Sequence, residues 1–597
     1  MDSAQVIYTE LTECQDCYKC LRECPVKAIQ IVRGHARVLE DRCIHCGNCV
    51  EICPQKAKKV RSDLERAKIL IRLRQKTVLS LAPSFIAEFS GIPMQKLIAG
   101  CKKLGFSHVS ETSVGADAVS ESVSKTIAEQ QPPLMLSSAC PAVVQYVDKY
   151  LPEMSGFIST ACSPMVAHAR LIKQTLGPGT AVVFAGPCIA KKREADASEG
   201  AVDVALTFQE LRQWFCEEGI DPEDAAVRDE DSFFLNQAQD GILYPIEGGM
   251  VASIKHLKHS DAHCMTYSGI HQIQEAVRGI TDQYLEHVHN PGNQKTLFLE
   301  MLACEGGCVN GPMVQQSGGT VAKRLRVLSE KEKRAERGRV LSEPVSVQDI
   351  AADLTMPQSI RQKPVAAVAV SEEDIKAALA SIGKYSRKDE LNCSGCGYDS
   401  CQAFAAAMFL GKAEKTMCLS YTRKLAQKKA NALLKAMPSA AVVVDASMHI
   451  VECNKPFAEL LGTDVMELYA LKPSLEGADL RKLLPFWEAF EQVLMPESQD
   501  IVASDFQCNG KIVHGSVFSI EKGLLAGGLF QDITAPWIQK DRVISQARKV
   551  MSQNLRTVQK IAYLLGENAA EAEAALTSII ESFQSERSGD SYKSNKE

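Results

Sequence analysis

The chain has little of what marks membrane, secreted or nucleic-acid-binding proteins. It has no stretch of about 18 consecutive apolar residues, so we expect no membrane-spanning helix. The opening residues, MDSAQVIYTELTEC, lack the basic region and the apolar region of a secretory signal, which predicts a cytoplasmic protein. Lys and Arg number 67 against 73 Asp and Glu, and the net charge of −6 provides no general basic field that would attract nucleic acid.

Aromatic residues are scarce as well, at 6 % of the chain. Hydrophobic residues nevertheless make up 45 % and charged residues 23 %, which are ordinary values for globular domains and exclude disorder of the whole chain. Since a domain usually contains about 100–200 residues, the 597 residues predict about three to five domains.

Cysteine, in contrast, is abundant, with 22 residues that occur in clusters. In a cytoplasmic protein such clusters indicate metal ligands before they indicate disulfides. A chain of this length also buries enough apolar surface to be stable without disulfide bonds. The cysteines are therefore the best guide to function.

The first cluster lies in residues 1–60, where the pattern C-x2-C-x2-C-x3-C-P occurs twice, as CQDCYKCLRECP and CIHCGNCVEICP. This pattern is typical of bacterial two-cluster ferredoxins, in which three cysteines of a run bind one 4Fe-4S cluster and the fourth binds the other. Zinc is the alternative, but zinc sites prefer isolated pairs of ligands. The pattern assigns one cluster to Cys14, Cys17, Cys20 and Cys53, and the other to Cys43, Cys46, Cys49 and Cys24.

Residues 77–320 alternate strand and helix patterns. TVLSLAP (77–83) and TAVVFAGP (180–187) are typical of buried strands, and helical patterns such as MQKLIAGCKKLGF (94–106) and PMVAHARLIKQTL (164–176) lie between and around them. This alternation predicts α/β layers for the segment. For the whole chain we expect a multidomain protein of α+β and α/β class.

Four cysteines of this segment lie in three distant stretches: SSACPAVVQYV with Cys140, AGPCIAKKRE with Cys188, and EMLACEGGCVNGP with Cys304 and Cys308. By spacing alone, only the last pair suggests a metal site. Together, the three stretches resemble the signature motifs of FeFe-hydrogenases, and the similarity extends to TACSPMVAHARLIKQ, VDVALTFQEL and YPIEGGM. The resemblance covers most of the segment and implies an α/β H-cluster domain.

The resemblance implies a cofactor, the H-cluster, in which a 4Fe-4S cluster is joined through one cysteine to a two-iron centre with CO, cyanide and azadithiolate ligands. By the same resemblance, Cys140, Cys188 and Cys304 ligate only the 4Fe-4S part, and Cys308 bridges to the two-iron centre. Lys191 matches the family lysine that donates to a cyanide, a contact that suits a compact ammonium with three donors. The alternative for Lys191 is a surface lysine in the run KKR. Cys308 and Lys191 are thus the predicted catalytic residues.

The sequence departs from the productive family members at positions that handle protons. The residue before the first ligand is a proton-passing cysteine in those members, and here it is Ala139. The helix after the GAD stretch is rich in glutamate there, whereas GADAVSESVSKTI contains only Glu121, out of the expected register. Two methionines of the motifs are replaced by Gly186 and Leu302. Because a proton relay needs a donor within hydrogen-bond reach of each position, we expect slow turnover.

Four other cysteines of this half match no motif, and free cysteine usually behaves as a small buried hydrophobe. Cys162 is the exception to examine, because its stretch TACSP is expected to line the site. The four are Cys101, Cys162, Cys216 and Cys264.

A third cluster occupies residues 386–425, after a segment (321–385) whose charge run SEKEKRAERGR predicts a solvated helix and a linker. The stretch CSGCGYDSCQAFAAAMFLGKAEKTMC resembles the small helical 4Fe-4S domain of corrinoid iron–sulfur proteins. Zinc is the alternative, although the CGY and the Phe- and Ala-rich helix favour iron–sulfur. The predicted ligands, which would bring the accessory 4Fe-4S clusters to three, are Cys393, Cys396, Cys401 and Cys418.

Residues 431–536 resemble a PAS domain. MPSAAVVVDASMHIVECNKPFAELLG matches its opening strand pair and its first helix, with Asn454 at the start of that helix. PAS folds sense ligands, redox state or partners and often dimerise, so the resemblance implies a homodimer. Residues 537–584 have an amphipathic helical pattern, and these C-terminal helices would transmit a signal or dimerise.

Three functions are consistent with these observations. The first is an H2-sensing FeFe-hydrogenase of low turnover, whose iron–sulfur relay connects H2 and proton chemistry to a PAS output that a downstream signalling protein detects. The second is a catalytic hydrogenase that exchanges electrons with a ferredoxin-like partner. The third is a non-enzymatic, hydrogenase-like protein of iron–sulfur assembly that lacks the two-iron centre; Lys191 and the intact GGCVNG stretch argue against it.

Overall fold

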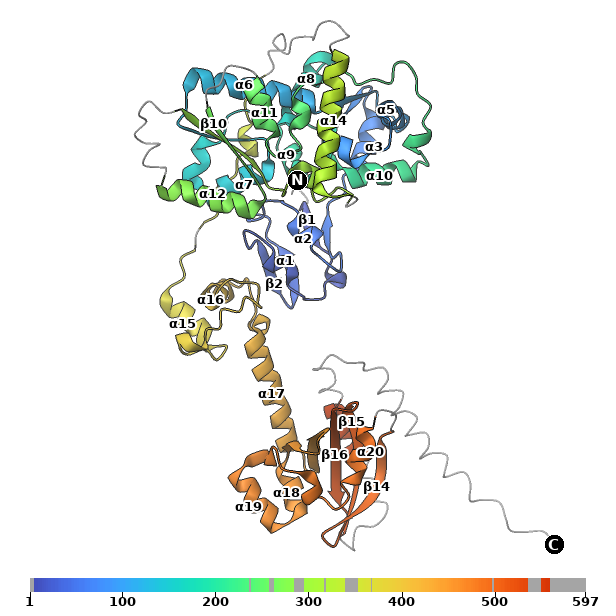
Figure 1. The fold of residues 1–597 in the computed structure, drawn as a ribbon, viewed down its shortest axis with the longest axis vertical. Helices are drawn as coiled ribbons and strands as arrows, with labels where there is room; N and C mark the ends of the chain where they lie inside the picture. The colour runs from blue at the N-terminus through green and yellow to red at the C-terminus, as the bar shows by residue number, and fades with distance from the viewer. Residues whose placement is uncertain are drawn as a thin grey trace, which may run out of the picture. The chain divides into compact units, whose positions relative to one another are not determined.

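The computed structural model forms two compact units, Met1–Met417 and Cys418–Glu597 (Figure 1), and each is described by itself. Within the described residues, no helix combines the length and the apolar character needed to cross a membrane. The structure describes residues 5–235, 238–256, 262–283, 295–315, 318–338, 353–366, 368–495, 499–534 and 549–558.

The N-terminal domain of the first unit contains two short antiparallel strand pairs and two one-turn helices. The third cysteine of each run lies in one of these helices, Cys20 in the first and Cys49 in the second. The strands pair antiparallel as β1 (Ile7–Thr9) with β4 (Lys58–Val60) and β2 (Ile29–Val32) with β3 (His35–Val38). The helices are α1 (Lys19–Arg22) and α2 (Asn48–Glu51). The internal repeat in the sequence is therefore a structural repeat.

The large domain contains two parallel sheets, which confirms the α/β prediction. The four-stranded sheet has the order β6 (His108–Glu111), β5 (Thr77–Leu81), β8 (Ala181–Gly186) and β9 (Val204–Thr207). The three-stranded sheet has the order β10 (Ala262–Ser268), β11 (Thr296–Leu302) and β7 (Leu134–Leu136).

Helices pack around both sheets (Figure 1), because parallel strands need crossover connections that place helices on their faces. Strands β5 and β8 are accordingly buried at every position, as their continuous apolar runs predict. The helices are α3 (Leu64–Leu73), α4 (Phe85–Glu88), α5 (Met94–Lys103), α6 (Ser113–Gln130), α7 (Pro141–Tyr150), α8 (Pro164–Leu176), α9 (Ala190–Asp196), α10 (Phe208–Glu217), α11 (Gly249–His256) and α12 (Ile270–Gln283).

The segment that the sequence predicts to be a linker differs from that expectation in its first part. Residues Thr320–Gly338 form helix α14, whose Val327 is fully buried. Arg334, inside the charge run, is 8 % exposed and donates two hydrogen bonds to the buried carboxylate of Glu111. Burial of a charge is stable only when it is paired, and this long-range partner makes α14 part of the domain core.

The third cysteine segment forms a small helical body with α15 (Glu372–Ala380) and α16 (Cys401–Phe409), which pack on each other. Ser371 and Ser400 cap the two helices by accepting hydrogen bonds from the backbone three residues on. Phe404 is buried in this body, where its ring centroid lies 5.7 Å from that of Tyr398.

The second unit begins with α17 (Leu419–Ala436) and continues into a five-stranded antiparallel sheet, as a PAS domain requires. Asn454 is fully buried at the N-cap of α18; its side-chain oxygen accepts from the Phe457 and Ala441 N–H groups, and its amide donates to Ser439. The strands, in sheet order, are β13 (Ile450–Cys453), β12 (Ala440–Asp445), β16 (Leu525–Asp532), β15 (Lys511–Glu521) and β14 (Ile501–Cys508). The helices are α18 (Lys455–Leu461), α19 (Thr463–Leu471) and α20 (Glu488–Leu494).

Of the predicted C-terminal helices, the described residues 549–558 are helical. The rest of that prediction lies outside the described residues.

Candidate functional site

Three of the four predicted H-cluster cysteines follow parallel strands directly. Cys140 comes after β7, Cys188 after β8, and Cys304 after β11. In α/β proteins, ligands bind at the carboxyl ends of parallel strands, where the loops of neighbouring strands meet. The topology therefore brings together cysteines that are up to 168 residues apart in the sequence, Cys140 and Cys308 being the outermost.

The four thiols converge on one buried place. Burial raises the pKa of Cys188 to about 11, and the nearby thiol of Cys140 adds to the shift. The pKa of Cys304 lies well above its ordinary value, chiefly because of burial and then because Cys308, Cys188 and Cys140 are close. Thiolates this close repel one another unless a cationic group lies between them.

The loop that carries Cys308 requires its two glycines for backbone reasons. Gly306 and Gly307 have φ values of 76° and 101°, in the region that favours glycine. A Cβ on Gly307 would lie 2.5 Å from the carbonyl oxygen of Pro245 and 2.9 Å from the Ile246 Cα. The pair thus lets the loop fold tightly against residues 245–246 and delivers Cys308 to the other three thiols.

Lys191 lies at the same place, in α9, and is 9 % exposed. Its Nζ donates to Glu194 Oε2 at 2.6 Å. Burial raises the pKa of Cys188 and of Cys308, and the charge of Lys191 opposes that rise in both. Burial raises the pKa of Cys162 to about 12; the charges of Glu194 and Lys191 also act on this thiol, so it lies beside the site as its stretch suggests. Glu194 itself carried no recognisable signal in the sequence.

The predicted proton-relay positions offer no acid close to these thiols. Ala139 has only its backbone N–H, which donates to Ser137 Oγ. Glu121 forms an ion pair with Lys125, a residue that is more than half exposed, one turn along α6. The buried face of α6 instead carries hydroxyls, and those of Ser113 and Ser124 are buried without a hydrogen-bond partner.

Glu300, which the sequence did not single out, is the buried carboxyl nearest in sequence to the cysteine loop. It lies on β11 and accepts the Val251 N–H at 3.0 Å, at the start of α11. Burial raises its pKa to about 7, and its charge acts on Cys308. The Glu300 carboxylate thus caps the N-terminal turn of α11.

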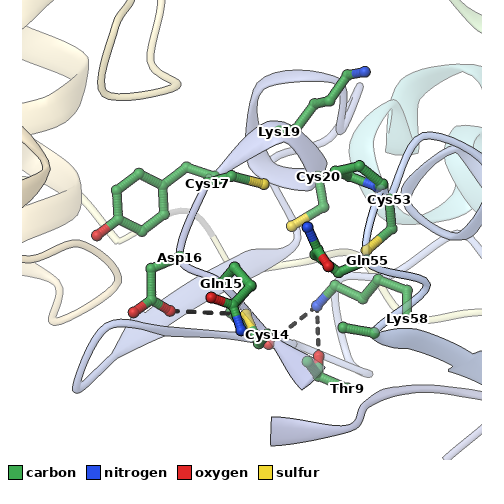
Figure 2. A pocket seen from close by; sticks show the side chains of 14 residues that line it. Thr9, Cys14, Gln15, Asp16, Cys17, Lys19, Cys20, Cys53, Gln55 and Lys58 are labelled. Atoms are coloured by element: carbon green, nitrogen blue, oxygen red, sulfur yellow. Dashed lines mark hydrogen bonds between the residues drawn. The ribbon is translucent and has the colours of Figure 1, made fainter. Parts of the chain in front are cut away.

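The first ferredoxin group is visible as a pocket (Figure 2) lined by Cys14, Cys17, Cys20 and Cys53. Burial raises the pKa of Cys20 to about 11, and the nearby thiols of the same four contribute. Cys17 is exposed, so this group lies at the protein surface. Cys53, the fourth cysteine of the second run, thus lies beside the first three cysteines of the first run.

The second ferredoxin group lies against the hydrogenase domain. Burial raises the pKa of Cys46 to about 12, and the thiols of Cys24 and Cys140 both add to the shift. A Cβ on Gly47 would lie 2.5 Å from Pro312, in the loop that follows Cys308. The cysteines of this group, which act on one another's pKa values, are Cys24, Cys43, Cys46 and Cys49.

Lys58 is a residue that the sequence analysis missed. It is 4 % exposed, donates to Thr9 Oγ1 and to the Ala36 carbonyl oxygen (Figure 2), and its charge lowers the pKa of Cys20 and of Cys49. Its ammonium is therefore close to both ferredoxin groups. Nothing in the run QKAKK distinguishes it from a surface lysine.

The predicted ligands of the third cysteine segment are exposed to the same degree as those of the first ferredoxin group. Cys393 is exposed, and Cys396 and Cys401 are partly buried. Cys418, the fourth predicted ligand, is buried and is the first residue of the second unit.

The donor sets fit iron–sulfur clusters. Each convergent group supplies four thiol sulfurs, as a 4Fe-4S cluster needs. Buried thiols with raised pKa values ionise only beside a cation, and an iron cluster provides one. In the central group, Lys191 adds a buried ammonium for anionic ligands of the metal.

Four protein-family models match parts of the chain. The models are those of the iron only hydrogenase large subunit, C-terminal domain (residues 75–312), a 4Fe-4S dicluster domain (6–54), a putative Fe-S cluster (389–420) and a PAS domain (429–499).

Curated relatives are distant. The NADP-reducing hydrogenase subunit HndD of Solidesulfovibrio fructosivorans is 24 % identical over 382 residues, which cover 52 % of this chain and 64 % of that protein. Iron hydrogenase 1 of Clostridium pasteurianum is 24 % identical over 306 residues, 43 % of this chain and 53 % of that protein. The matches thus span less than two thirds of these two hydrogenases.

A nuclear prelamin A recognition factor from Homo sapiens is also similar, with 26 % identity over 340 residues, 46 % of this chain and 74 % of that protein. A solved FeFe-hydrogenase from Chlamydomonas reinhardtii, 18 % identical with a TM-score of 0.33, covers 52 % of this chain and 100 % of that chain. By the family-model matches alone, residues 75–312 form a domain of the iron-only hydrogenase large-subunit family, which this chain joins to a 4Fe-4S dicluster domain, a further Fe-S segment and a PAS domain.

Proposed function

We propose that this protein is an H2-sensing FeFe-hydrogenase of low turnover, with an iron–sulfur relay and a PAS output. The observation that carries the proposal is Ala139, next to the proposed ligand Cys140. It replaces the proton-passing cysteine of productive hydrogenases inside a site that keeps all four cysteines and Lys191. Such a site can bind H2 and still exchange protons slowly, which suits detection better than metabolism.

The proposed cofactor residues are those named from the sequence. Cys140, Cys188, Cys304 and Cys308 would hold the H-cluster, with Cys308 as the bridge. When bound, that cofactor supplies reversible splitting of H2 into protons and electrons. The convergence and burial of the four thiols support this assignment.

The surrounding residues bind and orient, but they do not relay protons well. Lys191 would direct its ammonium toward a cyanide while Glu194 fixes the lysine from the other side. Ala139 can neither give nor take a proton, and Glu121 is paired with Lys125. Since general acid–base catalysis contributes typically about 100- to 10,000-fold, loss of the relay accounts for slow turnover.

The ferredoxin domain would carry electrons between the central site and a partner. Cys46 acts electrostatically on both Cys140 and Cys304, so the second ferredoxin group is the natural entry to the central site. Cys17 is exposed in the other group, where a ferredoxin-like partner would exchange electrons. The cofactors in this proposal are three accessory 4Fe-4S clusters and the H-cluster.

The PAS domain would provide the output by passing the signal to a downstream signalling protein. The protein would act as a cytoplasmic homodimer. The support is the place of the PAS domain in the chain after the third cysteine segment, to which α17 connects it. A ligand can shift a conformational equilibrium only when the two states bind it differently, so the proposal requires that H2, through the redox state of a cluster, favours one conformation of the PAS domain.

Infrared spectroscopy of anaerobic protein, matured with the two-iron precursor, tests the proposal. We expect bands of bound CO and cyanide that change under H2, together with slow H2 turnover. Cys308→Ser is the matched variant and should lose most of the band intensity, since the proposed bridge is gone.

Two other outcomes decide between functions. Fast turnover would make the chain a catalytic hydrogenase with the PAS domain as a regulator. Absence of the bands in iron-replete protein would contradict the hydrogenase function and favour an iron–sulfur assembly protein. The similarity to the prelamin A recognition factor makes that outcome important to examine.

A further inference from the structure

The third cysteine segment packs on the ferredoxin domain, about 370 residues away in the sequence. Lys27 Nζ donates to the Gly397 carbonyl oxygen at 3.0 Å and also to the Arg22 carbonyl oxygen at 3.0 Å. A Cβ on Gly397 would lie 3.1 Å from Leu21 Cγ, so the backbone of the segment rests directly on α1. Gly397 has a φ of 91°, which a side chain would oppose.

A second row of contacts follows the strand β2 and the turn after it. The Ile31 N–H donates to the Lys412 carbonyl oxygen at 2.9 Å, and Gln30 Nε2 donates to the Gly411 carbonyl oxygen at 2.7 Å. The carboxylate of Glu414 accepts from the backbone N–H groups of Arg33 and Gly34. Main-chain bonds of this kind fix the orientation of the two surfaces.

Tyr398 follows Gly397, whose backbone makes part of this contact. Its side chain is within electrostatic range of two thiols, Cys396 of the third segment and Cys24 of the second ferredoxin group. The residue is 6 % exposed, and its hydroxyl is buried without a hydrogen-bond partner. Because a buried hydroxyl without a partner loses its hydrogen bond to water and gains none in return, an acceptor is expected beside it.

We propose that this contact is an intramolecular electron-transfer interface, in which the Tyr398 hydroxyl donates a hydrogen bond to a sulfur atom of the cluster held by the third segment. The proposal rests on the cluster assignments made above. It defines a branch: the second ferredoxin group faces the hydrogenase domain through Cys46 and the third segment through Cys24.

The electron balance is simple. One electron leaves the cluster at the second ferredoxin group, which is oxidised, and reduces the cluster of the third segment, while no bond forms or breaks. The electron comes from H2 or from dithionite. The cluster of the third segment thus receives electrons through the ferredoxin domain rather than directly from the hydrogenase domain, although the chain order suggests the latter.

Tyr398→Phe tests the hydrogen bond. The ring and its packing on Phe404 remain, and only the donor is removed. Donors to cluster sulfurs stabilise the reduced state, so the midpoint potential of the third cluster should fall while the other potentials stay unchanged. A dithionite titration followed by electron paramagnetic resonance measures this without any H2 chemistry. Tyr385→Phe, at an exposed tyrosine just before the segment, is the control. Unchanged potentials in Tyr398→Phe would overturn the assigned hydrogen bond.

Glu414→Ala tests the route, because it removes the acceptor for two backbone groups of the ferredoxin domain. Rapid-freeze electron paramagnetic resonance after H2 addition should show slower reduction of the third cluster, with the ferredoxin clusters reduced at the wild-type rate. Glu372→Ala, at an exposed residue of helix α15, which packs on α16, should change neither rate. If the Glu414→Ala protein does not retain the third cluster, Gln30→Ala serves as a second interface variant, because it removes the hydrogen bond to the Gly411 carbonyl oxygen.

The outcomes separate this inference from the proposed function. If H2 reduces no cluster in the wild type, the proposed function fails, whereas the titration of Tyr398→Phe still decides the hydrogen bond. If H2 reduces the third cluster equally fast in the wild type and in both interface variants, the route through this contact is wrong.

Discussion

Lys191 Nζ lies 2.6 Å from Glu194 Oε2, one turn further along α9, and both side chains are largely buried. A buried ion pair is held by the attraction of its members, and either charge alone is costly. Glu194 therefore holds the lysine side chain in place next to Cys188 and Cys308. This pairing supports a role for Lys191 in the site rather than on the surface.

Lys191→Met should weaken retention of the two-iron centre and move the cyanide bands in the infrared, because the ammonium donor is lost. It also leaves Glu194 buried and unpaired, at a cost of about 3–5 kcal/mol. The double variant Lys191→Met, Glu194→Gln separates the two effects, since it removes the stranded charge. Wild-type bands in the double variant would exclude a contact between Lys191 and the cofactor.

Ala139→Cys should raise H2 evolution or isotope exchange, because it restores a titratable group next to Cys140. A full proton relay contributes about 100-fold or more to the rate. We expect the gain in turnover to be well below that, since α6 has no glutamate in the expected register. Ala139→Ser, similar in size but without an easily ionised group, is the control. Identical turnover in all three proteins would place the bottleneck elsewhere, in electron supply for example.

Metal analysis should find about 18 iron atoms per chain, for three accessory 4Fe-4S clusters and one H-cluster. Cys396→Ser should remove about four of them without affecting the other clusters. About 14 iron atoms per wild-type chain, together with about one zinc atom, would show that the third segment binds zinc instead of an iron–sulfur cluster.

His168 predicts acid sensitivity of the hydrogenase domain. Its ring is fully buried between the hydroxyls of Ser80 and Ser110, and burial lowers its pKa to about 3. In the unfolded chain the pKa is about 6.5, so its contribution is complete above that pH and is lost as the pH falls toward 3. At pH 5 the loss is about 2 kcal/mol.

Thermal unfolding at about pH 8 and pH 5 measures this effect. The wild type should lose more stability on acidification than His168→Gln, whose side chain does not titrate. His271→Gln, at an exposed histidine of the same domain, should behave like the wild type. Equal losses in the wild type and in His168→Gln would contradict the assignment.

The sequence predicts well the features that depend on residues close to one another along the chain. The strand runs that became β5 and β8, the helices α5 and α8, and the PAS asparagine Asn454 depend on neighbouring residues. Cysteine spacing is local too, and the two ferredoxin groups converge as that spacing suggests.

The features that the sequence does not reveal depend on distant partners. The charge run around Arg334 suggests solvent, but Glu111, more than 200 residues earlier, makes burial of the arginine stable. Lys58 and Glu194 are ordinary charged residues until the fold brings them to the thiols. The contact of Gly397 with Leu21 follows from surface shape, for which no sequence pattern exists.

Hydrogen–deuterium exchange of residues 419–534, under H2 and under argon, tests the central claim most directly. Infrared spectroscopy of the same samples must show that the H-cluster has responded to H2. An H2-sensing protein should then show altered protection in α17 or in the PAS sheet, and Cys308→Ser should abolish the difference. Identical protection under both gases, with a responding H-cluster, would contradict sensing and leave catalysis as the function.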